Sequence, residues 1–204
     1  VNYRKAREFP YPAAVEDAVA AYKQMLADGY ENIVIMGDSA GGGLTLALIQ
    51  MIRKHKLPRA AGAVLLSPWT DLTLSGDSIH SKKDADPLIQ PHLLEIFSKR
   101  YYGDANPTDP LISPLFADLK GFPPTLIQVG TNEILLDDST RLAQKMHKAG
   151  VDVTLDVYEN MMHVWQFFGG LMPEANSAIE TIGNFVKNIK VTTKSDRLDT
   201  LAVY

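Results

Sequence analysis

Short apolar runs alternate with helical segments along most of this chain, and this alternation restricts its fold more than any other feature. Runs rich in β-branched and other apolar residues, typical of strands buried in a parallel sheet, lie at 32–36, 63–66, 125–129 and 153–157. Helical periodicity is found at 12–29, 40–55, 139–149 and 173–189. Strands that alternate with helices form βαβ units, so the sequence predicts an α/β fold with a mainly parallel sheet flanked by helices.

The organisation of the chain suits a single domain. It has 204 residues, of which 46% are hydrophobic and 22% charged, enough for one substantial core. A long excursion rich in proline, at 71–124, follows the second predicted strand and contains one helical stretch at 93–102. Such excursions often shape a substrate pocket. The predicted domain covers 1–190, and the polar tail at 191–204, which lacks periodicity, is expected to be loosely ordered.

Composition argues against several classes of partner. The formal net charge is −4 and no Lys or Arg run concentrates positive charge, so neither nucleic acid nor an anionic membrane is favoured. The absence of cysteine excludes disulfides and thiolate sites and suits a reducing compartment. The longest apolar stretches, such as 61–66, are far shorter than the roughly 20 residues of a membrane span. The first residues lack the features of a signal peptide, so we expect a cytoplasmic protein.

A G-x-S-x-G pentapeptide, Gly37 to Gly41, lies directly between a predicted strand and a predicted helix. This context is typical of a sharp turn that exposes a nucleophilic serine, because side chains at the glycine positions would collide with neighbouring backbone. The Ala40 N–H, at the amino end of the helix, can hydrogen-bond the oxyanion that forms when Ser39 attacks a carbonyl. The same pentapeptide pattern also occurs in glycine-rich turns without catalytic roles, but the flanking strand and helix favour the catalytic interpretation.

A nucleophilic serine needs a base, and His163 is the histidine best placed to serve. It lies in a loop after the last predicted strand and before the last predicted helix. His147 and His55 lie within or at the end of a helix, where histidines are commonly solvated or cap the helix, and His80 and His92 lie in the excursion. The spacing of these histidines offers no ligand cluster, so the sequence predicts neither a metal site nor a cofactor.

The base in turn needs a carboxylate that holds its tautomer and stabilises the imidazolium, and the usual chain order is serine, acid, histidine. Three carboxylates follow the third predicted strand: Glu133, Asp137 and Asp138. Asp137 and Asp138 immediately precede a helical segment and are well placed to cap its amino end. Glu133 lies in the loop just beyond Gly130, which favours it as the acid.

With these residues, the chain resembles the hormone-sensitive-lipase-like family of bacterial α/β-hydrolase esterases from Tyr3 to Phe185. The motifs that carry the resemblance follow the family's order and are FPYPAAVED at 9–17, GDSAGG at 37–42, SPWTDL at 67–72, DP at 109–110 and SPL at 113–115. Residues 133–137 match the family's D-P-x-x-D stretch with glutamate in place of the acid, which supports Glu133. Residues 162–165 resemble the segment that carries the family's histidine. Near the start, YRKARE at 3–8 departs at two positions from the family's Y-R-L-A-P-E.

Trp69, Asp71 and Leu72 belong to one of these motifs, and we expect them to pack and anchor a loop beneath the pocket. The resemblance also implies segments that these residues do not contain. They are an H-G-G-G stretch whose N–H groups complete the oxyanion hole, an N-terminal cap over the pocket, and a strand beside 32–36. The sequence is therefore expected to be the C-terminal two-thirds of the family's catalytic domain. Since one oxyanion donor contributes roughly 2.7–4 kcal/mol, this chain alone is expected to be nearly inactive.

The resulting hypothesis is a serine carboxylesterase for short-to-medium acyl esters. Ser39 attacks the ester, His163 moves the proton, Glu133 orients His163, and water releases the acyl-enzyme. The expected partner is a small-molecule ester, and the family resemblance implies a homodimer through the last strand and helix. One alternative is a non-catalytic small-molecule-binding protein on the same scaffold, which would lose a triad member. Another is a serine peptidase, whose triad chemistry is the same.

Overall fold

The computed structural model describes residues 1–189 and 199–203. Its strands are β1 (Ile33–Asp38), β2 (Gly62–Leu66), β3 (Thr125–Gly130), β4 (Val153–Tyr158) and β5 (Asp199–Val203). They form a five-stranded sheet in the order β4-β3-β2-β1-β5, and every pair of neighbours is parallel. The predicted α/β fold with a mainly parallel sheet is therefore confirmed.

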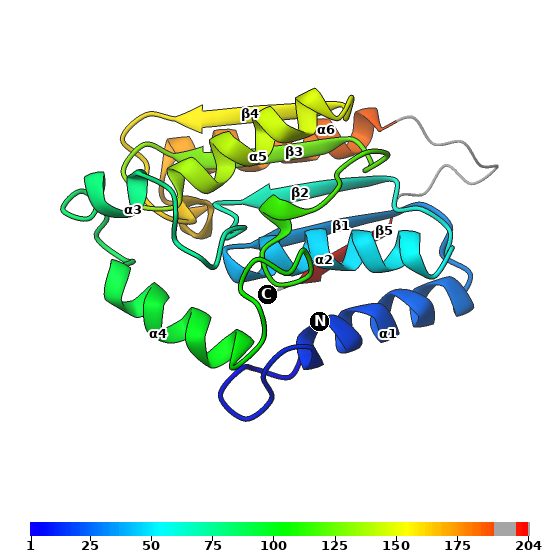
Figure 1. The fold of residues 1–204 in the computed structure, drawn as a ribbon. Helices are drawn as coiled ribbons and strands as arrows, with labels where there is room; N and C mark the ends of the chain where they lie inside the picture. The colour runs from blue at the N-terminus through cyan, green and yellow to red at the C-terminus, as the bar shows by residue number, and fades with distance from the viewer. Residues whose placement is uncertain (190–198, 204) are drawn as a thin grey trace.

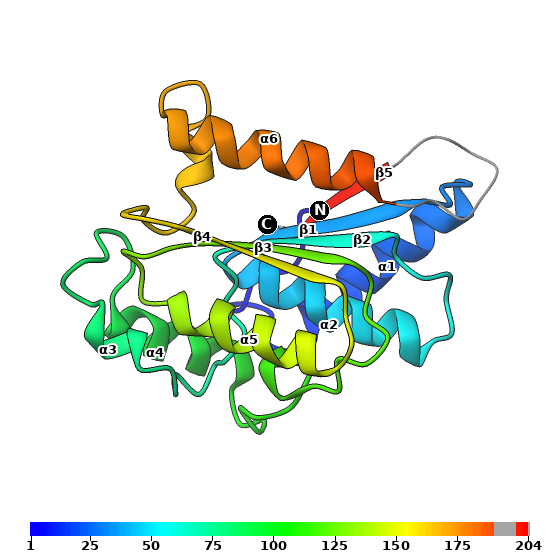
Figure 2. The ribbon, with the colours of Figure 1, turned by 90° about the horizontal axis from the view of Figure 1, so that it is seen from above.

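Helices cover both faces of this sheet (Figure 2). On one face lie α1 (Ala13–Ala27), α2 (Ala40–Lys54) and α5 (Leu136–Lys148), and on the other lies α6 (Pro173–Asn188). Each predicted strand and helix forms, with ends displaced by three residues at most. Within the described residues, no helix is long and apolar enough to cross a membrane. The cytoplasmic location stays a prediction.

Alternate residues of the strands fill two separate cores, which explains why the strands are apolar on both sides. Ile33 and Ile35 of β1 pack into the core beneath α1 and α2, and both are completely buried. Val34, between them, points the other way and packs with Ile182 of α6. A strand covered on both faces shows no polar alternation, and this is the pattern found in the sequence.

The first part of the excursion at 71–124, with α3 (Ser78–Ser81) and α4 (Pro91–Tyr102), lies beyond the carboxyl ends of the strands, and its last residues return to the amino end of β3 (Figure 1). The excursion also contains the short 3-10 helix η1 (Pro114–Phe116). Part of the excursion packs with residues of the loops after β2 and β3 in a separate apolar core, which consists of Trp69, Leu72, Ile79, Leu94, Ile112, Ile134 and Leu135. This packing holds α4 beyond the carboxyl ends of β1 and β2, where the loops that follow these two strands begin.

Among the strands of the described residues, β5 is the one that the sequence does not predict. Asp199–Val203 pairs in parallel with β1, with Thr200 opposite Val34. The tail was expected to be loosely ordered, and a strand missing from the sequence was expected beside 32–36; the structure places β5 at that position. The backbone groups of β1 on this side need hydrogen-bond partners, and a short extended segment supplies them. Residues 190–198 and 204 of the tail lie outside the described residues.

Candidate active site

Ser39 lies on the sharp turn that joins β1 to α2. Its backbone has φ 50° and ψ −118°, a conformation that non-glycine residues rarely adopt and that persists only where neighbouring structure holds it. The Ser39 N–H donates to the Leu66 carbonyl at 2.8 Å, and the Ser39 carbonyl accepts from the Trp69 N–H at 2.8 Å. The loop after β2 therefore holds this strained serine in place.

Two glycines make the turn sterically feasible. A Cβ at Gly37 would overlap the Gly41 carbonyl and lie 2.7 Å from Thr45 Oγ1. A Cβ at Gly42 would lie 2.7 Å from Pro68 Cβ, so α2 could not approach the loop after β2 as closely. The predicted steric need for glycine before the serine is thus found at Gly37. At Gly42, glycine allows a second close approach, between α2 and Pro68. Ala40 begins α2, so its N–H is among those that have no partner within the helix.

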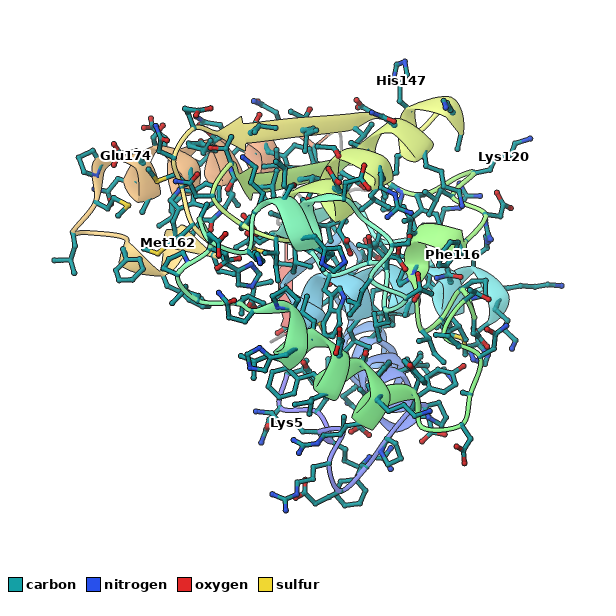
Figure 3. The ribbon with its side chains drawn as sticks, turned by 60° about the vertical axis from the view of Figure 1, so that its left-hand side comes forward. Lys5, Phe116, Lys120, His147, Met162 and Glu174 are labelled. Atoms are coloured by element: carbon teal, nitrogen blue, oxygen red, sulfur yellow. The ribbon has the colours of Figure 1, made fainter. Side chains whose placement is uncertain are left out.

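A cavity of about 470 Å³ lies beside Ser39 and Ala40. The amino-terminal segment, the start of α2, the loop after β2, and α4 form its walls. Figure 3 shows Lys5 of the amino-terminal segment next to α4, on the opposite side of the molecule from Lys120. The Tyr11 N–H donates to the Tyr101 carbonyl at 2.8 Å, which ties the amino-terminal segment to the end of α4.

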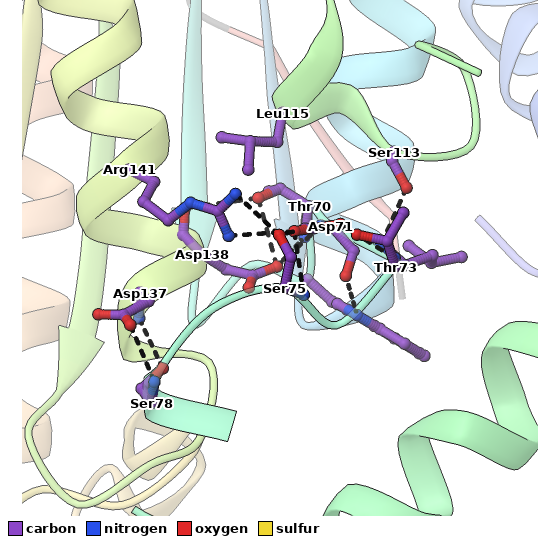
Figure 4. A network of polar contacts seen from close by, with 12 residues as sticks. Thr70, Asp71, Thr73, Ser75, Ser78, Ser113, Leu115, Asp137, Asp138 and Arg141 are labelled. Carbon is purple, nitrogen blue, oxygen red and sulfur yellow. Dashed lines mark hydrogen bonds and ion pairs between the residues drawn. The ribbon is translucent and has the colours of Figure 1, made fainter. Parts of the chain in front are cut away.

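Trp69 and Leu72 themselves line this cavity, and this corrects their expected role beneath it. Their side chains join the apolar core of the excursion, so the same packing shapes the cavity wall. Asp71, in contrast, does anchor the loop. Its carboxylate accepts from Ser75 Oγ at 2.6 Å and from Arg141 Nη1 at 3.0 Å (Figure 4).

The structure brings Glu133 and His163 together. Glu133 Oε2 lies 2.9 Å from His163 Nδ1, and the two residues are 0% and 5% exposed. They come from the loops after β3 and β4, which neighbour each other in the sheet. A buried carboxylate at Nδ1 favours the tautomer with hydrogen on Nδ1 and leaves Nε2 as the basic nitrogen.

His163 is also close enough to the β1–α2 turn to act on it electrostatically. Burial raises the pKa of Asp38, whose own backbone N–H and the charge of His163 act in the opposite direction. Asp38 directly precedes Ser39. The hydrogen bonds of the described residues do not include one between Ser39 Oγ and His163. Such contacts often tighten only with substrate present.

Ser67 is a buried member of the site that the sequence did not reveal. Its hydroxyl donates to Glu133 Oε1 at 2.8 Å and accepts from the Val164 N–H at 3.2 Å. The Gly130 N–H also donates to Glu133 Oε1, at 2.6 Å. Ser67 thus links the acid to the residue after His163. The only signal in the sequence is its position at the end of a strand, in the SPW stretch.

Asp137 and Asp138 do not compete with Glu133 for the histidine. Asp137 Oδ2 accepts from the Ser78 N–H at 2.8 Å, and Asp138 Oδ2 accepts from the N–H groups of Thr70 and Asp71 at 2.6 and 2.8 Å (Figure 4). The expectation that they cap α5 is wrong, because no side chain caps that helix and both carboxylates bind backbone N–H groups of residues 70–78. Burial raises the pKa of Asp138 to about 7, and the Thr70 and Asp71 N–H groups oppose this rise.

No group of three or more acidic or histidine side chains able to hold a metal occurs within 1–189 and 199–203. Of the other histidines, His55 follows the end of α2, and His147 lies in the last turn of α5. His80 belongs to α3 and His92 to α4. The structure therefore brings only His163 into contact with a predicted site residue.

Comparisons with known proteins agree with this geometry. A family profile described as alpha/beta hydrolase fold matches residues 1–167. An acetyl-hydrolase of Streptomyces hygroscopicus is 42% identical over 189 residues, which are 92% of this chain and 63% of that protein. An esterase of Acinetobacter venetianus is 39% identical over 192 residues, 93% of this chain and 63% of that protein. This chain thus spans less than two thirds of these relatives.

Solved structures give the same result. The crystal structure of an esterase from the bacterial hormone-sensitive lipase family superposes with a TM-score of 0.88 at 46% identity. The superposition covers 90% of this chain and 63% of that protein. A hormone-sensitive lipase from a metagenome library superposes with the same TM-score at 44% identity, over 92% and 65% of the two chains. The resemblance to this group is confirmed, and the chain belongs to the alpha/beta-hydrolase-fold family.

Proposed function

We propose that this chain carries the catalytic triad of a carboxylic-ester hydrolase, with Ser39 as nucleophile, His163 as base and Glu133 as acid. The observation that carries the proposal is the buried 2.9 Å contact between Glu133 and His163 beside a serine held in a strained turn. The naming of relatives as esterases and an acetyl-hydrolase supports the same reaction class. No cofactor or metal takes part in the proposed reaction.

The proposed reaction has two halves. Ser39 Oγ attacks the ester carbonyl while its proton passes to His163 Nε2, and Glu133 stabilises the imidazolium that results. The oxyanion accepts a hydrogen bond from the Ala40 N–H. The alcohol leaves with the proton from His163, and the acyl group stays on Ser39. Water, deprotonated by His163, then attacks the acyl-enzyme and restores the serine.

The proposed substrates are esters of short-to-medium acyl chains. The cavity beside Ser39 has a volume of about 470 Å³, which is within the usual size of small-molecule sites. The first similar protein named above is an acetyl-hydrolase. Relative rates on p-nitrophenyl esters from C2 to C16 test this proposal. A maximum among the short esters supports it, and a maximum at C16 contradicts it.

Hydrolysis of p-nitrophenyl butyrate tests the function itself. The assay compares this chain with a version extended at its amino end by the H-G-G-G-bearing segment of a relative, each beside a Ser39→Ala control. Turnover that disappears in Ser39→Ala supports the esterase, and turnover confined to the extended version shows that the second oxyanion donor is needed. If neither folded protein turns over, the alternative of a non-catalytic small-molecule-binding protein is favoured.

A further inference from the structure

Basic side chains gather around the cavity beside Ser39. The residues that line it include Arg4, Lys5, Arg7 and Arg100, and no acidic residue is among them. The chain as a whole has 24 acidic and 20 basic side chains and a net charge of −4. The charged side chains that line this cavity are therefore all basic, although the chain as a whole carries a net negative charge.

Only one of these cations is already neutralised by a neighbour. Arg4 binds Asp17 at 2.8 Å and Glu16 at 3.0 Å. Within the described part of the chain, no ion pair involves Lys5, Arg7 or Arg100. These three side chains are exposed at the cavity and have donors to offer a ligand.

The positions of these cations in the sequence are informative. Lys5 and Arg7 are the two positions at which YRKARE differs from the Y-R-L-A-P-E of the family that the chain resembles. In that family motif both positions are uncharged. Arg100 approaches from α4, on another wall of the cavity. Two separate segments, which the Tyr11–Tyr101 hydrogen bond ties together, thus present positive charge to the same apolar cavity.

We propose that this cavity selects esters that carry a carboxylate away from the scissile bond, held by Lys5, Arg7 and Arg100. An apolar cavity with cations on two of its walls suits a ligand that combines an apolar part with an anionic group. Arginine forms paired hydrogen bonds with a carboxylate, which adds orientation to the electrostatic attraction. The substrate class rests on the proposed esterase function, whereas the anion site itself does not.

A binding measurement tests the anion site without catalysis. Ser39→Ala protein is titrated calorimetrically with 4-phenylbutyrate and with its uncharged analogue 4-phenylbutyramide. We expect the carboxylate to bind about three- to tenfold more tightly at low salt, and this preference to shrink as salt screens the exposed cations. Equal binding of the two ligands would overturn the proposal.

Charge-neutralised variants locate the site. The combined Lys5→Gln, Arg7→Gln and Arg100→Gln variant is expected to lose the preference for the carboxylate and keep its affinity for the amide. The matched control carries Lys56→Gln, Arg59→Gln and Lys120→Gln. These three side chains line a separate hollow at the amino ends of the strands. Retention of the preference in the first variant, or an equal loss in the control, contradicts the assignment.

Hydrolysis extends the test to the substrate class. The adipic acid monoester of p-nitrophenol is compared with p-nitrophenyl hexanoate, which has the same acyl length and no charge. A higher kcat/KM for the monoester that disappears in the Lys5, Arg7 and Arg100 variant supports the proposal. A preference for the hexanoate contradicts the proposed substrate class. Absence of hydrolysis of either ester by the version extended with the H-G-G-G-bearing segment contradicts the esterase function and leaves the binding result to decide on the anion site.

Discussion

The Ser67 hydroxyl donates a 2.8 Å hydrogen bond to one carboxylate oxygen of Glu133, and the other oxygen of Glu133 lies 2.9 Å from His163. The same hydroxyl accepts from the N–H of Val164, which follows His163 in the chain. Three loops, after β2, β3 and β4, therefore meet at one buried hydroxyl. We therefore expect the position of Glu133 relative to His163 to depend on this contact.

Replacement of Ser67 by alanine tests this dependence. The change leaves Glu133 Oε1 with one donor fewer and the Val164 N–H without its acceptor. In the version extended with the H-G-G-G-bearing segment, we expect kcat on p-nitrophenyl butyrate to fall on the order of ten- to hundredfold. Ser113→Ala is the matched control, because Ser113 is equally buried and its hydroxyl also joins two segments, Leu72 and Pro107. If the two variants lose similar stability but Ser67→Ala loses more kcat than Ser113→Ala, a positioning role for Ser67 is supported. Equal losses of kcat in the two variants contradict that role.

The choice of acid is tested by Glu133→Gln beside Asp137→Asn. Glutamine keeps the shape of the side chain but removes the charge that stabilises the imidazolium. In the version extended with the H-G-G-G-bearing segment, we expect Glu133→Gln to lower kcat by about three to four powers of ten. Asp137 contacts Ser78 instead of the histidine, so Asp137→Asn is expected to change kcat less than about tenfold. A larger loss in Asp137→Asn than in Glu133→Gln would reverse the assignment.

The glycine before the serine turn is tested by Gly37→Ala. The added methyl group would overlap the Gly41 carbonyl, which cannot move without displacing α2. We expect a loss of about 1–3 kcal/mol in the free energy of unfolding, together with loss of activity. Gly183→Ala in α6 is the control, because a Cβ there meets nothing within 4 Å. That variant is expected to gain about 0.5–1 kcal/mol in helix stability. A neutral effect of Gly37→Ala in urea unfolding contradicts the tight turn.

The buried Asp138 predicts a dependence of stability on pH. Burial raises its pKa from 3.8 to about 7, so the folded chain holds this proton more tightly than the unfolded chain. The contribution of Asp138 is therefore fully present below about pH 4 and is lost as the pH rises through 7. Relative to Asp138→Asn, which does not titrate, the free energy of unfolding is expected to fall by up to about 4 kcal/mol over this range.

Urea unfolding of both proteins across this pH range measures the difference. Asparagine keeps an oxygen that can accept from the Thr70 and Asp71 N–H groups, so the two proteins differ mainly in titration. A difference that does not change with pH, or that changes in the opposite direction, contradicts a raised pKa for Asp138.

Periodicity predicted the strands that are buried on both faces and the helices that are buried along one side, because buried positions require apolar residues and therefore appear as a pattern in the sequence. Ile33 to Ile35 and the helix after Ser39 are examples. The pairing of β5 left no such mark, because a five-residue strand is held by backbone hydrogen bonds that any sequence can make. The predicted homodimer and cytoplasmic location stay predictions.

The positions of Ser39, Glu133 and His163 in loops directly after strands were predicted because each motif has a fixed place relative to a strand, and their catalytic roles stay predictions. Ser67 was not predicted because its role depends on contacts with residues 66 and 97 positions away in the chain. For the same reason the sequence could not show that Asp138 binds Thr70 instead of capping α5. Contacts of this kind follow from the order of strands in the sheet.

Reaction of the chain with phenylmethanesulfonyl fluoride tests the central claim most directly. The Ser39 hydroxyl displaces fluoride to form a sulfonate ester, and peptide mass spectrometry identifies the modified residue. The account predicts modification of Ser39 above all other serines, at a rate that falls sharply in His163→Ala and in Glu133→Gln. Modification that is spread over several serines, or that proceeds at Ser39 without regard to His163, would show that Ser39 is not the activated nucleophile.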